Sequence, residues 1–511
     1  MSLLDKASLV QIPSGYGDGK LYSVKPTNGD GDFTFSRSSS GTRVNSDGLI
    51  ETASVLGTTE EVTNGDFSSG TGWNQNPNWS ISGGVAIADG TSSSDINQGT
   101  LSAVIGKKYL ISFDVVSLSQ GTFLAKIGGV GVVGNAVGSF SATVTATSTD
   151  RLRIVAQSNA IGTIDNVSVI EYIENDIPRL DYSGGASCAS LLLEPQTQNL
   201  VTYSEDFSQW SELTPNDLTY VSDLVNPDGS VGGYKVSRDG IYLGISLLTT
   251  TQRSIYARSV SGSGNVQLFT HNSNTNNVFT ITEEWQRFDV NSTTSASAVG
   301  NYYIDLRGVL STLSELYVWG AQATNDQSYV TSYIPTSGST VTRSADVCNG
   351  AGTSATFNDS EGVLFFEGKT TFDSSLSRRV SISDGSISNR VSLEFDESVE
   401  NTIKAFINSS ALVYAANNLS IYNKIAFQYK SGEHKLWING NEVKTSTNTS
   451  IPSGLDRLNF DGGNGGNDFY GNTKQLMVFD EALSDEELSD LTGQVNTSFA
   501  ELANFYNYTI L

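Results

Sequence analysis

Short runs in which apolar and polar residues alternate dominate this chain, and they constrain its fold more than any other feature. Clear runs begin at Tyr109, Arg151, Ser254 and Lys424. A period of two is typical of half-buried β-strands, because successive side chains point to opposite faces of a sheet. Turn dipeptides separate the runs, for example Asn439-Gly440. The sequence therefore predicts an all-β protein, and its clearest helical signal is a capping box from Ser484 to Glu487.

The charge balance excludes several classes of protein. The chain has 511 residues, which suggests three or four domains, and a formal net charge of -25. No cluster of Lys and Arg offsets this charge, so we expect no nucleic-acid partner. No apolar run approaches the length of a membrane span, and Asp5 and Lys6 interrupt the N-terminus where a signal peptide needs apolar residues. We expect a protein made in the cytoplasm, with no signal peptide, transmembrane segment or membrane insertion.

An internal repeat divides the first two thirds of the chain. Asp66-Phe67-Ser is followed by Trp73, and Asp206-Phe207-Ser is followed by Trp210. In both copies an alternating strand comes about 50 residues later and another closes the unit. Two copies of one β-sandwich explain this spacing, and chance similarity between Ser- and Gly-rich strands is the alternative.

Both repeats resemble the jelly-roll carbohydrate-binding modules of bacterial glycosidases and phage tail proteins. The resemblance depends on Asn64-Gly-Asp-Phe67 and Ile164-Asp-Asn-Val167, motifs that lie on neighbouring first and last strands in that family. It implies one jelly roll at residues 57–172 and another at residues 199–342.

Residues 355–495 resemble the concanavalin-A-like, laminin-G-type lectin fold. The motifs that carry this resemblance are Glu361 to Glu367, Lys424 to Gly440 and Phe469 to Leu488. It implies a third β-sandwich, followed by a C-terminal tail at residues 496–511. The full prediction is an all-β chain of tandem β-sandwiches, two jelly rolls plus a concanavalin-A-like sandwich.

The connecting segments resemble tailed-phage virion proteins, especially the openings of phage fibres. They are residues 8–16, 33–51, 177–182, 191–207 and 332–343. In that class the Gly-Leu-Ile-Glu segment runs almost directly into the Pro-Arg-Leu-Asp-Tyr segment, so residues 57–172 are interpreted as an insertion. The resemblance implies a small N-terminal β-unit for virion attachment, made of residues 1–56 and completed by residues 173–198. Residues 343–356 lack apolar anchors and predict a protease-sensitive linker.

The jelly-roll resemblance also implies candidate calcium ligands. Such modules often hold a structural Ca²⁺ between the first and last strands through carboxylate and carbonyl oxygens. Asn64, Asp66 and Asp165 match those positions in the first repeat. Asp206 matches in the second repeat, where Gly320 replaces the closing aspartate. The alternative is that neither repeat holds an ion.

Two sets of residues are candidates for contact with a carbohydrate. Trp73 and Trp79 lie among Asn, Pro and Gly, so we expect them to be exposed and able to stack on a sugar ring. The other four tryptophans are expected to pack in cores: Trp210, Trp285, Trp319 and Trp437. The second set comes from an acceptor-rich glycine loop and consists of Asp461, Asn464, Asn467, Asp468 and Tyr470. A glycine-rich loop without a ligand is an equal alternative.

Nothing in the sequence favours catalysis. Glu283 and Glu284 would point to opposite faces of a strand, and Glu486 and Glu487 belong to a helix N-terminus. No nucleophile elbow, HExxH motif or P-loop occurs. We therefore expect a protein that is not an enzyme.

Three functions remain open at this point. The first is a tail or head fibre or spike that displays carbohydrate-binding domains toward host cell-surface glycans. The second is a purely structural head-fibre, decoration or baseplate component that binds capsid, tail or baseplate proteins. The third is a polysaccharide depolymerase.

The phage resemblance further implies a homotrimer in the virion. Its contacts would be apolar, because chains of charge -25 repel one another. The candidate contact residues are Leu3, Leu4, Leu9, Val10 and Ile12 at the N-terminus and Phe499, Leu502, Phe505 and Tyr506 in the tail. The alternative is that both segments pack on their neighbouring sandwiches.

Overall fold

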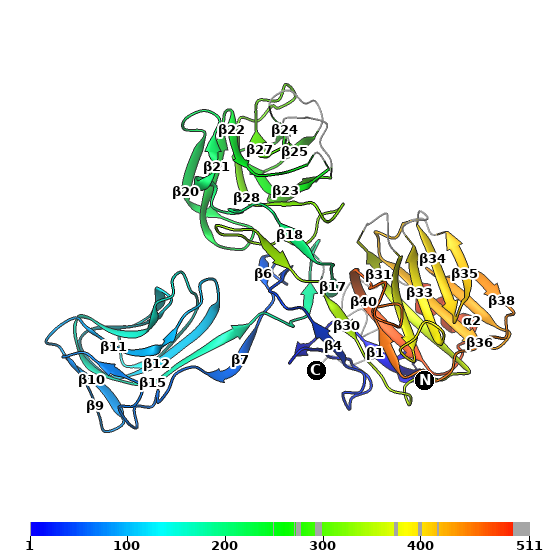
Figure 1. The fold of residues 1–511 in the computed structure, drawn as a ribbon, viewed down its shortest axis with the longest axis horizontal. Helices are drawn as coiled ribbons and strands as arrows, with labels where there is room; N and C mark the ends of the chain where they lie inside the picture. Colours follow the sequence, from blue (N-terminus) through cyan, green and yellow to red (C-terminus); the bar gives the residue numbers. More distant parts are fainter. Residues whose placement is uncertain are drawn as a thin grey trace. The chain divides into compact units, whose positions relative to one another are not determined.

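The secondary structure is almost entirely β, as predicted (Figure 1). The computed structural model describes residues 2–185, 187–248, 250–269, 271, 277–291, 299–371, 377–396, 401–415 and 418–493. Within them the helices are α1 (Leu3–Lys6), α2 (Asp485–Gly493) and the 3₁₀ turn η1 (Phe207–Gln209). The predicted capping box precedes α2, because the Glu487 N–H donates to Ser484 Oγ at 3.3 Å and the Ser484 N–H donates to Glu487 Oε2 at 3.0 Å. The tail at residues 496–511, with its four candidate trimer residues, lies outside the described residues.

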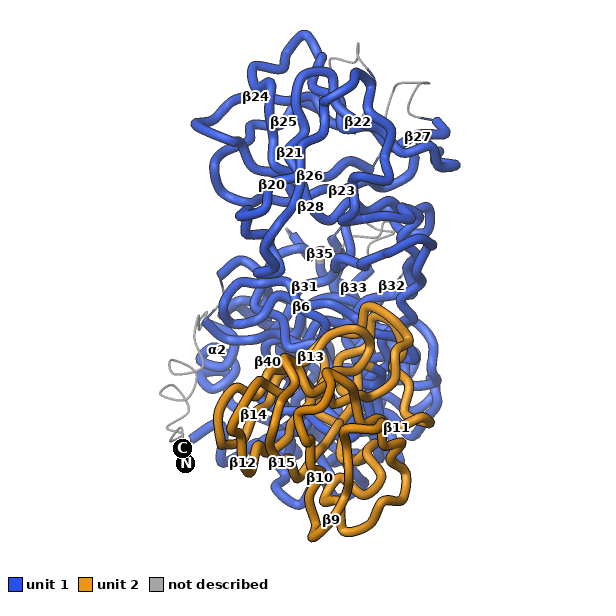
Figure 2. The backbone as a smooth tube through the Cα atoms, turned by 90° about the vertical axis from the view of Figure 1, so that its left-hand side faces the viewer, with its two compact units in different colours: residues 1–53, 175–511 blue, residues 54–174 orange. Residues whose placement is uncertain are grey.

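The chain forms two compact units, and one of them is an insertion in the other. Residues 54–174 form one unit, and residues 1–53 and 175–511 form the other (Figure 2). The inserted unit begins three residues before the predicted residue 57 and ends two residues after the predicted residue 172.

The inserted unit is built around two long antiparallel strands, β12 (Lys108–Ile127) and β15 (Arg151–Ile173). Bulges interrupt their pairing, so the strands bend and their two halves enclose one core. Strands β13 (Val130–Gly134) and β14 (Gly138–Thr145) extend the sheet beside β12. Strands β7, β10 and β11 (Val55–Glu60, Val85–Asp89 and Asp95–Ser102) extend it beside β15.

The second sandwich has its own core. Its larger sheet contains, in order, β20 (Leu218–Val225), β21 (Val231–Ser237), β28 (Glu315–Thr324), β23 (Gln252–Ser259) and β26 (Gln286–Val290). Its smaller sheet contains β19, β22 and β27 (Ser211–Glu212, Gly240–Gly244 and Asn301–Asp305). Strands β18 (Thr197–Asn199) and β29 (Val341–Arg343) pair at the ends of this module, close to the predicted limits of residues 199 and 342.

The C-terminal sandwich consists of two facing sheets. One contains β31, β36, β37, β38 and β40 (Glu361–Thr370, Asn423–Lys430, His434–Ile438, Asn441–Ser446 and Gly471–Phe479). The other contains, in order, β35 (Ser410–Ala415), β34 (Thr402–Ile407), β33 (Arg390–Asp396), β32 (Ser377–Ser383) and β39 (Arg457–Asn459). The core lies between them, and α2 packs on the outer face of the first sheet.

The predicted N-terminal β-unit is divided: β2 (Tyr16–Gly17), β3 (Lys20–Leu21) and β4 (Phe33–Ser36) form a small sheet with β30 (Val347–Asn349), whereas other N-terminal strands join the C-terminal sandwich. Strand β1 (Ala7–Gln11) pairs with residues 476–479 of β40, and β17 (Ser190–Leu193) pairs with residues 471–473. Strand β31 occupies the other side of β40. The physical reason is that β40 would otherwise be an open sheet edge, whose unpaired backbone groups and apolar side chains need a partner.

The N-terminal apolar side chains are consequently used inside the chain. Leu4, Leu9 and Val10 are buried against the C-terminal sandwich, and Leu3 and Ile12 pack against the same side chains. The three buried side chains are not available for a trimer contact, so this part of the trimer prediction is wrong, whereas Leu3 and Ile12 are only partly buried.

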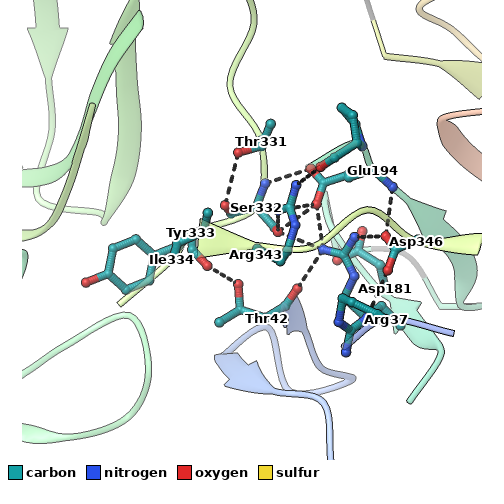
Figure 3. A network of polar contacts seen from close by, with 12 residues as sticks. Arg37, Thr42, Asp181, Glu194, Thr331, Ser332, Tyr333, Ile334, Arg343 and Asp346 are labelled. Carbon is teal, nitrogen blue, oxygen red and sulfur yellow. Dashed lines mark hydrogen bonds and ion pairs between the residues drawn. The ribbon is translucent and has the colours of Figure 1, made fainter. Parts of the chain in front are cut away.

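A buried network of charged groups connects distant segments (Figure 3). The Arg179 guanidinium contacts both Asp346 and Glu194, the latter at 2.5 Å. Arg37 pairs with Asp346 at 3.0 Å, and Arg343 pairs with Glu194 at 2.8 Å. All five side chains are at most 3% exposed. Because a buried charge is costly without a partner, the network ties the N-terminal segments to both ends of the second sandwich.

The predicted linker at residues 343–356 takes part in this arrangement, so the expectation that it lacks anchors is wrong, and its protease sensitivity stays a prediction. Arg343 and Asp346 belong to the network, and Cys348 and Ala351 are buried in the C-terminal core. Strand β30 (Val347–Asn349) pairs with β4 (Phe33–Ser36). A segment held by buried charges and strand pairing is expected to resist cleavage.

Candidate functional site

Trp73 and Trp79 are core residues, so their predicted exposure is wrong. Trp73 is 6% exposed and Trp79 is 5% exposed. Trp73 packs on Phe67 with ring centroids 5.0 Å apart, and Trp79 packs on Phe123 at 5.7 Å. Their indole N–H groups donate to backbone carbonyls of Asn64 and Ser94. The Asn and Gly neighbours indicated a loop, but the composition of a loop does not determine whether a tryptophan side chain points to solvent or to the core. Burial of the large apolar ring is favoured.

The first and last motifs of the inserted unit lie side by side, as the resemblance implied. The Val167 N–H donates to the Gly65 carbonyl at 2.9 Å. Asn166, just before Val167, has a left-handed backbone with φ of 51°. This contact closes the unit by joining its beginning to its end.

The second sandwich repeats this closure. The Ala321 N–H donates to the Ser204 carbonyl at 2.8 Å, and Gly320 before it has φ of 63°. The position of Gly320 therefore matches Asn166, and the position of Asp165 is taken by Trp319. The expectation that Gly320 replaces the closing aspartate is off by one residue.

The four predicted calcium ligands accept hydrogen bonds from their own loops. Asn64 Oδ1 accepts from Ser68 Oγ and the Ser69 N–H, and Asp66 Oδ1 accepts from the Ser68 N–H. Asp165 Oδ1 accepts from the Asn166 N–H.

Asp206 is also engaged locally. It accepts from the Ser208 hydroxyl at 2.6 Å and from the Tyr234 hydroxyl at 2.8 Å. Burial opposes but does not outweigh these hydrogen bonds, which lower the Asp206 pKa. The described residues contain no group of three or more His, Cys, Asp or Glu that could hold a metal ion. A calcium site would need carbonyl and amide oxygens as well, and calcium stays a prediction.

Among the other tryptophans, three are in cores as expected. Trp210, Trp319 and Trp437 are buried. Trp285 is partly exposed, and the Arg258 guanidinium lies 5.4 Å from its ring centroid. Trp285 therefore meets the expectation of core packing only in part: it precedes β26 and packs against the buried cluster of Ile50, Trp319 and Tyr333 while its ring stays partly exposed.

The outer face of the β35-β34-β33-β32-β39 sheet is the strongest candidate site. Alternation sends Val380, Leu393 and Ala405 into the core. The residues of opposite parity form the polar face: Arg379, Ser381 and Ser383 on β32, Arg390, Ser392, Glu394 and Asp396 on β33, and Thr402, Lys404 and Phe406 on β34. Register places Ser381, Ser392 and Phe406 in one row across the three strands.

Two guanidinium groups flank that row. The Cζ atoms of Arg379 and Arg390 lie 5.5 and 5.3 Å from the centroid of the Phe406 ring. Arg379 forms an ion pair with Glu394, whereas Arg390 forms none among the described residues. Burial first, and then the charge of Arg379, lowers the Arg390 pKa, although an arginine remains protonated.

The rest of the row is short of hydrogen-bond partners. The Oγ atoms of Ser381 and Ser392 are buried and have no partner within the described part of the chain. A buried hydroxyl without a hydrogen bond is unfavourable by about 1–3 kcal/mol. Ser381 and Ser392 are 0% exposed and Arg390 is 5% exposed, so a ligand on this face would first meet the partly exposed Arg379 and Phe406.

Charged residues occupy the next row. Glu394 and Asp396 both contact the Lys404 ammonium. Burial lowers the Lys404 pKa, but hydrogen bonds to Asp396 and Glu394 outweigh it and raise the pKa. Lys404 is therefore a fixed cation whose charge is already balanced.

The predicted glycine loop folds over one edge of this polar face. Arg390 donates to the Gly462 carbonyl at 2.8 Å, and the Arg379 N–H donates to the Asn467 carbonyl at 3.0 Å. Asn464 and Asn467 are exposed at its tip. Their contact with a ligand stays a prediction.

The other three loop candidates are enclosed to different degrees. Asp461 is 1% exposed and accepts from Asn349 Nδ2 and from the Gly463 N–H, so it holds the loop together. Tyr470 is buried, with the Arg378 guanidinium 4.6 Å from its ring. Asp468 is partly buried, and burial followed by the charge of Asp461 raises its pKa. Asp461 and Tyr470 therefore position the loop.

Sequence reasoning missed the polar face itself. Arg379, Arg390, Ser381 and Ser392 were not singled out, although strict alternation in residues 377–383 and 390–396 was available as a signal. The polar face could be recognised only once the sheet showed which parity points outward.

Comparison with known proteins gives similar solved structures only. No protein-family model matches the chain, and no curated protein matches it. One similar structure is the Ruminococcus gnavus IT-sialidase CBM40 bound to α2,3-sialyllactose, with 18% identity over 27% of this chain and 84% of that chain, at a TM-score of 0.24.

Two further structures are comparably similar. Domain 4 of a GH43 extracellular arabinanase from Geobacillus stearothermophilus, in complex with arabinotriose, has 16% identity over 29% of this chain and 73% of its own, at a TM-score of 0.24. The binding domain of botulinum neurotoxin serotype G has 12% identity over 29% of this chain and 42% of its own, also at 0.24. None of the helices in the described residues is long and apolar enough to span a membrane.

Proposed function

We propose that the C-terminal sandwich binds glycans on the outer face of the sheet formed by β32 to β35 and β39. The observation that carries this proposal is the row of Ser381, Ser392 and Phe406, with two arginines beside it and two hydroxyls that have no partner among the described residues. Sugar hydroxyls can satisfy such hydroxyls and guanidinium groups, and the apolar C–H face of a pyranose can stack on the face of an aromatic ring. The concanavalin-A-like motifs in the sequence support the same assignment.

We further propose that the protein is a phage virion fibre or spike that displays this face toward host cell-surface glycans. The support is the sequence resemblance of the connecting segments to phage fibre openings. Capsid, tail or baseplate proteins would be its partners, and a homotrimer would raise avidity for weakly bound glycans. Calcium is kept in this proposal as a structural ion of the jelly rolls, and a melting temperature that is unchanged by chelation would remove it.

The binding test uses the full chain on a glycan array. Arg390→Ala removes the guanidinium beside the serine row. For any glycan that the native protein binds on the array, we expect this variant to bind about tenfold more weakly or worse. The matched control is Arg457→Ala. Arg457 lies on β39 of the same sheet, pairs with its exposed neighbour Asp456 and leaves the serine row untouched.

Three outcomes separate the alternatives. Equal binding by both variants would remove the polar face as the site. No binding to any glycan, together with defined complexes with capsid or baseplate proteins, would favour a purely structural virion component. Release of reducing ends from host polysaccharide would favour a depolymerase. Immuno-electron microscopy on intact particles tests the virion assignment, and absence of label would contradict it.

A further inference from the structure

A second site, apart from the polar face, lies in a pocket of about 370 Å³. Three parts of the chain line it: the N-terminal segment, the second sandwich and the C-terminal sandwich. Its charged and aromatic lining includes Arg43, Asp181, Glu194, Tyr256, Arg287, Tyr333 and Lys369. A volume in the range of roughly 300–1,000 Å³ is usual for small-molecule sites.

Two cations in this pocket lack a carboxylate partner. Arg287 donates to the Thr331 carbonyl at 2.7 Å and to Ser254 Oγ at 2.9 Å, and its Nε is buried without a hydrogen bond. The Lys369 ammonium lies 5.3 Å from the centroid of the Tyr422 ring. Within the described residues neither side chain forms an ion pair, whereas Arg43 pairs with Glu51 at 2.9 Å.

The carboxylates that line the pocket are already engaged. Glu194 is held by Arg179 and Arg343 of the buried network (Figure 3). Asp181 accepts hydrogen bonds from the N–H groups of Val44 and Ser183. The charged side chains that line the pocket are three cations, Arg43, Arg287 and Lys369, and two carboxylates, so the lining carries a net positive charge in a chain whose net charge is -25. Such a local reversal of charge favours an anionic ligand.

The remaining lining is rich in hydroxyl groups. Thr331, Ser332, Thr370, Thr371 and Ser420 border the pocket. The Tyr256 ring is partly exposed beside Arg287, whose Cζ lies 5.2 Å from the ring centroid. Each of these five hydroxyls donates a hydrogen bond within the chain, so toward a ligand it can only accept, and the hydroxyls of a sugar can donate to it.

We propose that this pocket binds one acidic saccharide unit, with Arg287 and Lys369 contacting its carboxylate and the threonine and serine hydroxyls contacting its ring hydroxyls. This site does not depend on the polar face, and glycan binding at either place can fail without the other. The pocket would make the protein selective for glycans that carry uronic or sialic acids.

The test is isothermal titration calorimetry on the full chain with glucuronate, N-acetylneuraminate, glucose and inorganic phosphate. We expect binding of at least one acidic sugar and none of glucose. Lys369→Gln should weaken that binding about tenfold or more, because a charge-assisted contact is lost. Lys369→Arg should restore most of it, and higher salt should weaken it.

Control variants keep the result interpretable. Lys235→Gln removes a cation of the second sandwich that is paired with Glu315 at 2.8 Å, and it should leave acidic-sugar binding unchanged. The Lys369 ammonium makes no hydrogen bond among the described residues, so Lys369→Gln should keep the native melting temperature.

Several results would overturn the inference. Absence of binding by both acidic sugars, or equal binding by native protein and Lys369→Gln, would exclude the site. Phosphate binding that Lys369→Gln abolishes, without any acidic-sugar binding, would show a plain anion site and contradict the saccharide. Glucose binding as tight as glucuronate binding would contradict the role of the carboxylate.

Discussion

The two repeated sandwiches agree in their closure and differ in what surrounds it. In the inserted unit Trp73 packs on Phe67, and in the second sandwich Trp210 packs on Phe207, both with ring centroids 5.0 Å apart. The Trp73 indole N–H donates to a backbone carbonyl at 2.9 Å, and the Trp210 indole N–H does so at 3.0 Å. The shared motif is therefore structural and does not by itself indicate a binding site. We call the packed Phe67–Trp73 pair and its counterpart Phe207–Trp210 the clasp.

The surroundings of the clasp show where the repeats have diverged. Asp165 of the inserted unit is partly exposed, and its counterpart Trp319 is buried against Tyr333, at 4.7 Å between ring centroids. Only the second sandwich takes part in the buried network, through Ser332 and Arg343. The comparison teaches that a repeated motif preserves a core while its outer face changes.

The largest expected effect is the loss of the clasp. Trp73→Ala and Trp210→Ala should each cost about 3–5 kcal/mol, because both remove a buried aromatic ring and leave a cavity. Hydrogen exchange of the full chain, read in peptides of β15 and β28, measures each unit separately. Trp285→Ala is the control, since this ring is partly exposed. If either variant kept the native protection of its backbone amides against exchange, the clasp would not stabilise both repeats.

An intermediate effect should separate the two repeats by their response to acid. Burial alone would raise the pKa of Glu194, but the charges of Arg343 and Arg179 outweigh it and lower the pKa from 4.5 to about 2. A depressed native pKa gives stability that is present above pH 4.5 and is lost as the pH falls toward 2. The shift corresponds to about 3 kcal/mol.

Calorimetry of the full chain at pH 6, 4 and 3 tests this response. The transition of the unit that contains Glu194 should move to lower temperature more than that of residues 54–174. Glu194→Gln should destabilise the unit that contains Glu194 at pH 6, and the melting temperature of that unit should then depend less on pH. Parallel shifts of both transitions would show that the network is not the source.

The smallest expected effect tests the matched backbone positions. Gly320→Ala should cost about 1–2 kcal/mol, because a side chain is strained at φ of 63° and its Cβ would lie 3.1 Å from Tyr256 Cδ2. Asn166→Gly should change stability by only a few tenths of a kcal/mol, since glycine adopts the same left-handed backbone. Thermal unfolding of both variants measures this. A large loss of stability in Asn166→Gly would instead show that the hydrogen bond from the Asn166 side chain to Asp114 is important for stability.

Local sequence was a good guide to strands, the helix and the ends of the repeats. The capping box at Ser484 was recognisable because its two hydrogen bonds join residues three positions apart. The inserted unit was recognisable from the segments on either side of it. In the phage proteins that these segments resemble, Gly-Leu-Ile-Glu runs almost directly into Pro-Arg-Leu-Asp-Tyr, so the residues between them were interpreted as an insertion. The burial of Trp73 and Trp79 was not, because a loop-like composition does not specify the direction of a side chain.

What the sequence alone determined is the period-two pattern, and with it an all-β chain with a repeated clasp. Only the tertiary structure decided that β1 and β17 complete the sheet beside β40, and that Arg37, Arg179, Glu194, Arg343 and Asp346 share one buried network. It also decided which parity of β32 and β33 faces outward. The physical reason is the sequence separation of the interactions. Alternation and capping act between near neighbours, whereas edge pairing and charge burial join residues up to hundreds of positions apart. A local sequence pattern cannot identify such distant partners.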